Sequence, residues 1–178
     1  MKKFKSTSVI WITGLSGAGK TTLAKSIYRK LSLKNNNTIL LDGDELRNIF
    51  IPLTGNHNNF AREERLALGC AYSNLCKILQ SQGFDIIIAT ISMFKEIYEL
   101  NRKQINNYFE VYLKTSIEEL RRRDSKGIYS KFDNSEINSV AGLDLKIDEP
   151  IDPHLVIEHP SELTIEELSD KVIRFVKE

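Results

Sequence analysis

Short apolar runs recur along the chain, and between them apolar residues repeat at the three- to four-residue spacing of helices. The runs predict strands covered on both faces, at 9–12, 38–41, 85–89, 109–113 and 155–157. The intervening segments predict six helices. One begins at 22, and the others span 45–49, 61–82, 94–107, 116–124 and 164–177. Because strand and helix alternate five times, we expect an α/β fold, a five-stranded parallel sheet with helices on both faces.

The longest predicted helix carries its apolar residues on one stripe, which we expect to face the core: Leu68, Ala71, Leu75, Ile78 and Leu79. Two later helices begin with a capping box, in which a hydroxyl residue and a glutamate three positions later bind each other's backbone N–H groups. The pairs are Ser116 with Glu119 and Thr164 with Glu167. These signals predict two helix starts more sharply than hydrophobic spacing does.

The periodic pattern stops between 125 and 148. This segment is polar, contains glycine and is longer than connections usually are in compact domains, so it predicts a lid. No internal repeat or low-complexity tract interrupts the rest of the chain. With 178 residues, the sequence therefore predicts one domain, 1–178, with a substantial core.

Composition and charge reduce the classes of partner that the protein is expected to bind. The chain is 41% apolar and 28% charged with a formal net charge of +1, which gives no general attraction to nucleic acid or to an anionic membrane. Residues 1–6 hold three lysines but lack the apolar segment of a signal peptide, and no stretch is long enough to span a bilayer. Cys70 and Cys76 lack the companions of a metal site. We expect a cytoplasmic protein with two reduced thiols.

The segment after the first strand fits a phosphate-binding P-loop, glycine, four residues, then glycine-lysine-threonine. Its glycines leave the backbone N–H groups open to a phosphate, and a helix follows with its positive end toward the same place. Lys20 would reach the β- and γ-phosphates of ATP, and the Thr21 hydroxyl would bind Mg²⁺. The predicted ATP-binding residues are Gly14, Leu15, Ser16, Gly17, Ala18, Gly19, Lys20, Thr21 and Thr22.

Two carboxylates, Asp42 and Asp44, follow the second predicted strand, and strand ends are where α/β sheets place their ligands. Phosphoryl transfer needs a metal and a base near the γ-phosphate. Asp42 is therefore a candidate Mg²⁺ ligand and Asp44 a candidate base, with Lys20 the third catalytic candidate. The alternative is that Asp44 only caps the helix at 45–49.

Three consecutive arginines, 121–123, end the helix that begins at Ser116. They either complement the helix C-terminus in solvent or bring one cation, Arg123, to ATP. No aspartate closes the third strand, and no Asn-Lys-x-Asp motif occurs, so GTPase, motor and transporter functions lose support.

The sequence resembles the adenylylsulfate (APS) kinase family over nearly its whole length. The P-loop is joined by further matching motifs in the same order: Leu41-Asp42-Gly43-Asp44 with Arg47, Phe60 and Arg65, Ile91-Ser92 with Phe94, Arg123-Asp124 with Lys126-Gly127 and Tyr129, Lys131, and Glu149-Pro150. The resemblance implies a P-loop kinase fold and transfer of the ATP γ-phosphate to the ribose 3′-hydroxyl of a nucleotide with a modified 5′-phosphate. It also implies a small-molecule partner and allows a homodimer.

The resemblance assigns roles to residues outside the P-loop. Arg47, Arg65 and the backbone at Ile91 and Ser92 would hold the acceptor's anionic end, while Phe60 would stack on its base. Ser92 is then a substrate contact, because direct transfer needs no phosphoserine. The full set of predicted acceptor-binding residues is Asp44, Arg47, Phe60, Arg65, Leu68, Ile91, Ser92, Phe94, Lys131 and Val140.

Departures from the family pattern gather where the acceptor would bind. Leu68 replaces an asparagine, Cys70-Ala71 an arginine pair, and Val140-Ala141-Gly142 a phenylalanine-threonine-glycine whose ring covers the adenine of APS. The changes are either drift in an ordinary APS kinase, which makes PAPS in sulfate assimilation, or signs of another acceptor. The sequence looks closer to a branch, found with bacterial capsule functions, that phosphorylates cytidine 5′-diphosphoramidate.

Two functions of other classes stay open. One is a non-enzymatic switch that reports ATP to a partner. The presence of Asp42, Asp44 and Arg65 argues against this function. The other is a nucleic-acid end kinase, which needs a basic track for the strand. The chain offers only the arginines at 121–123 for such a track, so we expect no nucleic-acid partner.

Overall fold

The computed structural model describes residues 7–54, 61–159 and 161–177. Its strands and helices follow the predicted alternation: β1 Val9–Thr13, α1 Lys20–Ser32, β2 Thr38–Asp42, α2 Gly43–Thr54, α3 Arg62–Ser81, β3 Asp85–Ala89, α4 Lys95–Gln104, β4 Tyr108–Thr115, α5 Ile117–Arg123, α6 Ile128–Asp133, β5 Leu155–His159 and α7 Ile165–Lys177. Each predicted strand is present, with its ends displaced by at most two residues.

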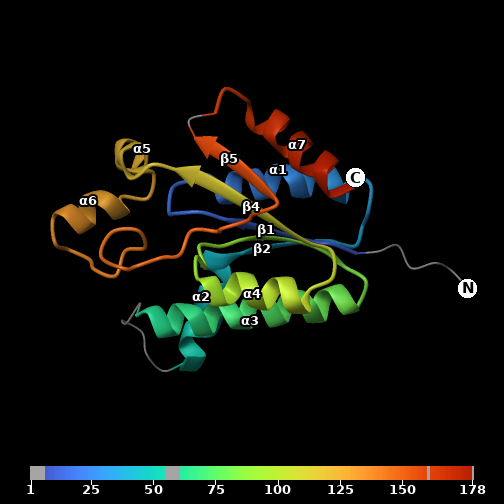
Figure 1. The fold of residues 1–178 in the computed structure, drawn as a ribbon, viewed down its shortest axis with the longest axis horizontal. Helices are drawn as coiled ribbons and strands as arrows, with labels where there is room; N and C mark the ends of the chain where they lie inside the picture. The colour runs from blue at the N-terminus through green and yellow to red at the C-terminus, as the bar shows by residue number, and fades with distance from the viewer. Residues whose placement is uncertain (1–6, 55–60, 160, 178) are drawn as a thin grey trace, which may run out of the picture.

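All five strands run parallel in one sheet of order β2-β3-β1-β4-β5, which confirms the predicted fold class. Helices cover both faces: α1 and α7 lie on one side, and α2, α3 and α4 lie on the other (Figure 1). Because the strands are parallel, their carboxyl ends meet at one edge. Ligands of open α/β sheets bind outside this edge.

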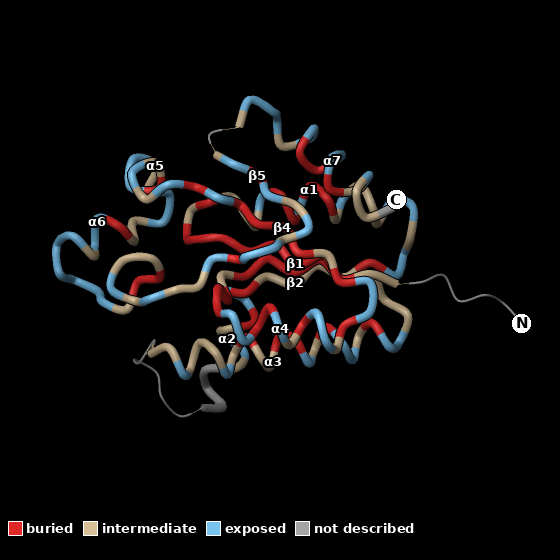
Figure 2. The backbone as a smooth tube through the Cα atoms, in the orientation of Figure 1, coloured by how far each residue is buried: buried red, intermediate tan, exposed pale blue. Residues whose placement is uncertain are grey.

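The residues of β1 explain why the strands are apolar without a break. Ile10 and Ile12 pack in a cluster with residues of α1 and α7, whereas Val9 and Trp11 pack in a second cluster with residues of α3 and α4. Successive side chains of a strand point to opposite faces, so a sheet covered on both faces needs apolar residues at every position. Figure 2 shows this buried layer through the middle of the molecule.

Helix α3 confirms the predicted stripe only in part, because Leu68, Leu75 and Leu79 pack against the core but the fully buried positions are others. Its buried residues are Gly69, Tyr72, Ser73, Cys76 and Gln80, whereas Leu68, Leu75 and Leu79 are only partly buried and Ile78 is 53% exposed. The reason is that α3 also packs on α4, through small and polar residues. A Cβ at Gly69 would lie 2.9 Å from Ile97 Cδ1, and the hydroxyl of Ser73 bonds Asn101.

Capping groups set several helix boundaries. Asp42 Oδ1 accepts the backbone N–H of Asp44 at 2.9 Å, so α2 begins at Gly43 and Asp44 is not its cap. Ser116 Oγ accepts from Glu119 N at 3.3 Å, and Thr164 and Glu167 bond reciprocally, as predicted. The helix predicted at 94–107 is shorter, Lys95–Gln104, because Ile105 is already extended.

The lid segment holds one helix that sequence spacing did not predict, α6. The carboxylate of Asp124 accepts from the backbone N–H groups of Tyr129 and Ser130, which starts this helix. The segment then folds back onto the P-loop: at Gly142, where φ is +83°, a Cβ would lie 2.9 Å from Leu15 Cδ2. Together with α5, it projects beyond the carboxyl edge of the sheet (Figure 1).

Both cysteines are free, and burial raises the pKa of Cys76 to about 12, as expected of an unreactive thiol in a core. Within residues 7–54, 61–159 and 161–177, no three histidines, cysteines or carboxylates are grouped as metal ligands. No helix among those residues has both the length and the apolar character to cross a bilayer.

Candidate active site

The P-loop connects β1 to α1 in a conformation that requires glycine. Gly14 has a φ of +148°, and a Cβ there would lie 2.6 Å from the carbonyl oxygen of Leu113. Lys20, the first residue of α1, donates from Nζ to Leu15 O at 2.8 Å. Burial, followed by the nearby charge of Lys126, lowers the pKa of Lys20 to about 8. The lysine is thus held over the loop that would cradle the phosphates.

The two predicted metal ligands lie side by side. Thr21 Oγ1 donates to Asp42 Oδ2 at 2.7 Å, which joins the start of α1 to the end of β2. Mg²⁺ prefers oxygen ligands and is usually held by one or two protein groups, with phosphates and waters completing the shell. A hydroxyl and a carboxylate beside a P-loop therefore fit this ion, although they do not form a complete cage.

Asp44 lies at the start of α2 and faces the lid. Its Oδ2 accepts from Lys126 Nζ at 2.6 Å, and its Oδ1 lies 3.5 Å from Arg47. Burial alone would raise the pKa of Asp44, but Lys126, followed by Arg47, outweighs it and holds the pKa below its ordinary value. The side chain is thus an ionised carboxylate, as a proton acceptor must be.

These groups border a cavity of about 500 Å³ at the carboxyl edge of the sheet. Its walls come from the P-loop, the ends of β2 and β3, helix α5 and the lid. The lining residues are Ser16, Gly17, Gly19, Lys20, Thr21, Thr22, Asp42, Gly43, Asp44, Arg47, Arg65, Ala89, Thr90, Ile91, Arg123, Ser125, Lys126, Ile128, Ile137, Asn138, Ser139, Val140 and Ala141.

A second hollow of about 20 Å³ adjoins the cavity on the side of α3, and five residues line both. Its lining residues are Arg47, Arg65, Leu68, Tyr72, Thr90, Ile91, Ser92, Phe94 and Ala141. Arg65 also donates to the lid carbonyl of Ser139 at 2.7 Å. Burial, with the charge of Arg47, lowers the pKa of Arg65 to about 10. The predicted acceptor residues of α2, α3 and the β3–α4 loop thus surround one place.

Some predicted site residues do not line either hollow. Lys131 is exposed on α6, and Phe60 lies outside the described residues. Gly14, Leu15 and Ala18 belong to the P-loop, but they are buried and do not line the larger cavity.

The three arginines at the end of α5 have different surroundings. Arg121 pairs with Asp133, and Arg122 with Glu119. Arg123 also reaches Glu119, with Nε at 2.6 Å from Oε1, but it lines the cavity. It is the arginine in a position to meet a nucleotide.

Sequence reasoning gave no individual role to three residues that border the site. Lys126 bonds Asp44, the Tyr129 hydroxyl donates to Ser16 O at 2.9 Å, and Thr90 lines both hollows. Lys126 and Tyr129 carry the family resemblance, and Thr90 follows a strand at the edge where ligands bind. The family motif and the strand end were therefore the only features of the sequence that pointed to these three residues.

Known proteins are similar to this chain in sequence and fold. Residues 6–158 match the family model described as Adenylylsulphate kinase. The chain belongs to the adenylylsulphate kinase family. The cytidine diphosphoramidate kinase of Campylobacter jejuni is 43% identical over 166 residues, 93% of this chain and 94% of that protein. A probable adenylyl-sulfate kinase of Archaeoglobus fulgidus is 39% identical over 150 residues, 84% of this chain and 94% of its own.

A solved structure agrees with these relatives. The Mycobacterium tuberculosis APS kinase, in complex with AMPPNP and APS, has a TM-score of 0.88 and 29% identity, over 97% of this chain and 99% of the other. The predicted P-loop kinase fold and family are therefore confirmed. The relatives named here are phosphotransferases, which supports the prediction of a kinase over that of a binding protein.

Proposed function

We propose that this protein transfers the γ-phosphate of ATP to the ribose 3′-hydroxyl of cytidine 5′-diphosphoramidate. The family supports the phosphotransfer, and the cavity supports it independently, because it joins a P-loop to an ionised carboxylate. The choice of acceptor is a narrower claim. It rests on the residues that line the acceptor side of the cavity.

Each catalytic group has a position suited to one task. The P-loop N–H groups and Lys20 would bind the β- and γ-phosphates, and Arg123 and Lys126 add positive charge at the same cavity. Thr21 and Asp42 would hold Mg²⁺, which neutralises charge between the phosphates when bound. Asp44 would take the proton of the attacking 3′-hydroxyl, once the acceptor displaces Lys126 from its carboxylate.

The observation that carries the choice of acceptor is that two aliphatic residues, Leu68 and Val140, line the two adjoining hollows. Val140 is 6% exposed and lines the larger cavity, while Leu68 lines the smaller hollow. An aliphatic side chain stacks on a base less well than a ring, and stacking contributes about 1–3 kcal/mol per base. A small pyrimidine loses less by this change than adenine does. The similarity to the Campylobacter jejuni kinase supports the same choice.

An ordinary adenylylsulfate kinase is the second candidate. The fold overlap with a kinase solved with APS favours it, as does the 39% identity to the Archaeoglobus fulgidus protein. In that case Val140 would supply enough apolar contact for adenine, and Leu68 would be a packing residue of α3.

Separate assays of the candidate acceptors, one acceptor in each, test the proposal. Purified protein with ATP and Mg²⁺ is given cytidine 5′-diphosphoramidate, APS, CDP or CMP at equal concentrations, and ADP release is measured. We expect kcat/KM for the diphosphoramidate to exceed that for APS by at least about tenfold. Equal or better use of APS would contradict the proposal and identify an ordinary adenylylsulfate kinase.

The variant Val140→Phe tests whether the aliphatic side chain at position 140 limits the use of APS. A ring at this position should raise kcat/KM for APS about five- to 150-fold, because it restores one stacking surface. Val156→Phe is the matched control, since Val156 is exposed on β5 and does not line the cavity. If both variants use APS like the wild type, Val140 does not select the base.

A further inference from the structure

Thr90 occupies a special place between the two hollows. It follows β3, is 5% exposed, and lines both the larger cavity and the smaller hollow. Its Oγ1 lies 2.9 Å from Ser92 Oγ, and either hydroxyl can be the donor. Gly43 leaves room for it, because a Cβ at 43 would lie 3.0 Å from Thr90 Oγ1 and 3.1 Å from its Cβ.

The smaller hollow is lined by two kinds of polar group. Arg47 and Arg65 supply guanidinium groups, which donate hydrogen bonds but do not accept them. The Tyr72 hydroxyl donates its proton to Gly43 O at 3.3 Å, so its oxygen can act only as an acceptor toward a ligand. Thr90 and Ser92 together have two protons and four lone pairs, and their mutual bond uses one of each. The pair keeps one donor and three acceptor positions.

Backbone carbonyls of the same loop are already engaged. Ile91 O accepts from the Thr13 hydroxyl, and Ser92 O accepts from the backbone N–H of Phe94 at 3.0 Å. The hydroxyl pair, with three acceptor positions left, therefore offers more acceptor capacity to a ligand in this hollow than either carbonyl does. A ligand that matches this hollow has anionic oxygens for the guanidinium groups and an N–H for the hydroxyl groups.

The two candidate acceptors differ at the corresponding atom. A sulfate end group and a phosphoramidate end group are both tetrahedral, and each carries a single negative charge. They differ because one oxygen of the sulfate is an amide nitrogen with hydrogens in the phosphoramidate. The arginine charges cannot separate two groups of equal charge and similar size, so discrimination must come from hydrogen bonding.

We infer that Thr90 determines specificity for the terminal group of the acceptor: the Thr90–Ser92 hydroxyl pair accepts an N–H of a terminal phosphoramidate. A sulfate presents only acceptors there, and the surplus lone pairs of the hydroxyl pair would face it without a proton. Sites that hydrogen-bond a substrate N–H reject analogues that lack it. This inference rests on the proposed function and names the group that distinguishes its substrate.

Thr90→Val tests the inference, because valine keeps the shape of threonine and removes its hydroxyl. For cytidine 5′-diphosphoramidate we expect kcat/KM to fall about ten- to 150-fold, mostly through KM, as for the loss of one hydrogen bond to an anionic group. For CDP and APS, which lack the N–H, kcat/KM should change less than about twofold. Thr90→Ser keeps the hydroxyl and should retain the wild-type preference. Thermal melting of each variant checks that it is folded.

The outcomes separate the inference from the function on which it rests. The wild-type acceptor panel alone decides whether the diphosphoramidate is the substrate. If it is, and Thr90→Val lowers kcat/KM equally for all acceptors, Thr90 only supports Gly43 and Ser92, and the inference is wrong. An unchanged preference in Thr90→Val also overturns it. If the wild type uses APS alone, both claims fail.

Discussion

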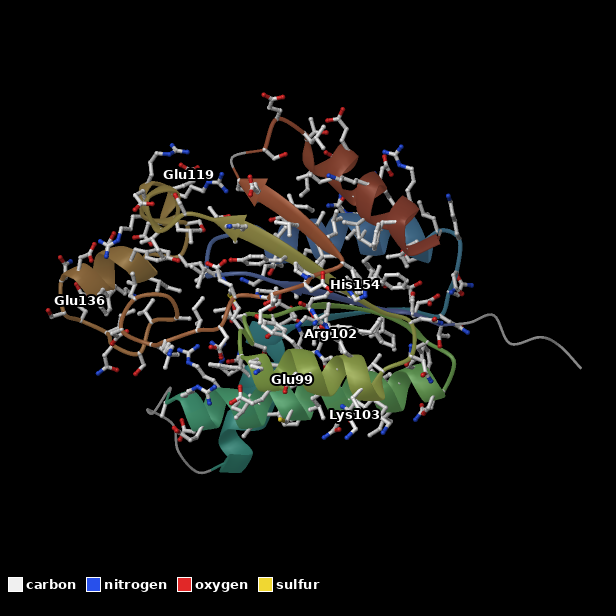
Figure 3. The ribbon with its side chains drawn as sticks, in the orientation of Figure 1. Glu99, Arg102, Lys103, Glu119, Glu136 and His154 are labelled. Atoms are coloured by element: carbon white, nitrogen blue, oxygen red, sulfur yellow. The ribbon has the colours of Figure 1, made fainter. Side chains whose placement is uncertain are left out.

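The two ends of the sheet both hold a hollow with charged side chains, but they use the charges differently. At the carboxyl edge, Lys20, Asp44 and Lys126 border the large cavity. At the opposite edge, a hollow of about 380 Å³ is lined by Arg102, Ile105, Asn107, Tyr108, Asp152, Pro153 and His154. Figure 3 shows Arg102 and His154 there, close to each other and far from α6.

Two charged residues of the amino-terminal edge, Arg102 and Glu110, pair within the protein. Glu110, which has no exposed surface, accepts from Arg102 at 3.2 Å and from the Tyr108 hydroxyl at 3.1 Å. Arg102 also donates to Asp152 O at 2.6 Å. Burial raises the pKa of Glu110, and the charge of Arg102 opposes the rise. This network ties the segment before β5 to α4 and leaves little for a ligand to bind.

At the carboxyl edge, by contrast, charges line an open space. The Lys126–Asp44 pair is about half exposed, so incoming phosphate and hydroxyl groups can replace it. The first turn of α1 also lies there, with N–H groups that no helix bond uses. The comparison teaches that charged residues in a hollow indicate a site only where a ligand can satisfy them better than the protein does.

The largest expected effect is at Asp44. Asp44→Asn should lower kcat by about 10² to 10⁴ with little change in acceptor KM, because a base acts in the transition state. Helix α2 should be unaffected, since Asp42 is its cap. Glu45→Gln, at the exposed neighbouring position, is the control in the same steady-state assay. Normal turnover by Asp44→Asn would place the base elsewhere.

Lys20→Ala comes next and tests the P-loop. We expect a loss of about a hundred- to a thousandfold in kcat, because the ammonium stabilises charge on the transferring phosphoryl group. Lys25→Ala, on the exposed side of the same helix, should behave like the wild type. Retention of more than about a tenth of wild-type turnover by Lys20→Ala would contradict the assignment.

The opposite edge should respond in stability and not in catalysis. Arg102→Met leaves Glu110 buried without its cation, so the free energy of unfolding should fall by about 2 kcal/mol, less than for a fully buried pair because Arg102 is partly exposed. Urea unfolding measures this, with the exposed Lys103→Met as control. A large change in kcat/KM without loss of stability would show that this hollow is a functional site.

The smallest effect is a pH dependence at His154, whose Nδ1 accepts the backbone N–H of Glu110 at 3.1 Å. Burial, then the charge of Arg102, lowers the pKa of His154 below its ordinary 6.5, although Asp152 acts in the opposite direction. The unfolded chain therefore binds the proton more readily, and the stability that His154 contributes is lost as pH falls below about 6.5. His154→Asn should lose this part of the pH dependence.

Urea unfolding of both proteins between pH 5 and pH 7.5 measures the difference. The wild type should lose more stability than His154→Asn toward the acid end. Equal slopes would mean that the imidazole is not held in its neutral form by this network.

The sequence predicted the fold where the signal is local and failed where packing partners are distant. All strands were predicted, because a parallel sheet needs continuous apolar runs. Helix α2 is longer than predicted and passes Pro52, which discourages a helix. The stripe of α3 was only partly right, because the helix also packs on α4 through Gly69 and Ser73, and a search for hydrophobic residues overlooks small or polar ones.

The site residues likewise fall into those that a local pattern predicts and those that it does not. The P-loop is one contiguous segment whose glycines, lysine and threonine stand at short fixed spacings, so its pattern alone predicted the loop, whereas the family resemblance also needed the further motifs along the chain. Asp42 and Asp44 were predicted because they follow a strand, and both line the cavity. The lid residues had no such context: Lys131 was predicted to reach the acceptor, but Lys126 borders the cavity.

The sequence by itself determined the parallel sheet, the P-loop and the membership of a kinase family, since these depend on residue types at short, fixed spacings. Only the tertiary structure decided how the lid closes the site. Lys126 meets Asp44 across 82 positions of sequence, and Arg65 meets Ser139 across 74. Such contacts depend on how α2, α3 and the lid converge at one sheet edge. No local pattern encodes that convergence, because it is set by the packing of whole elements.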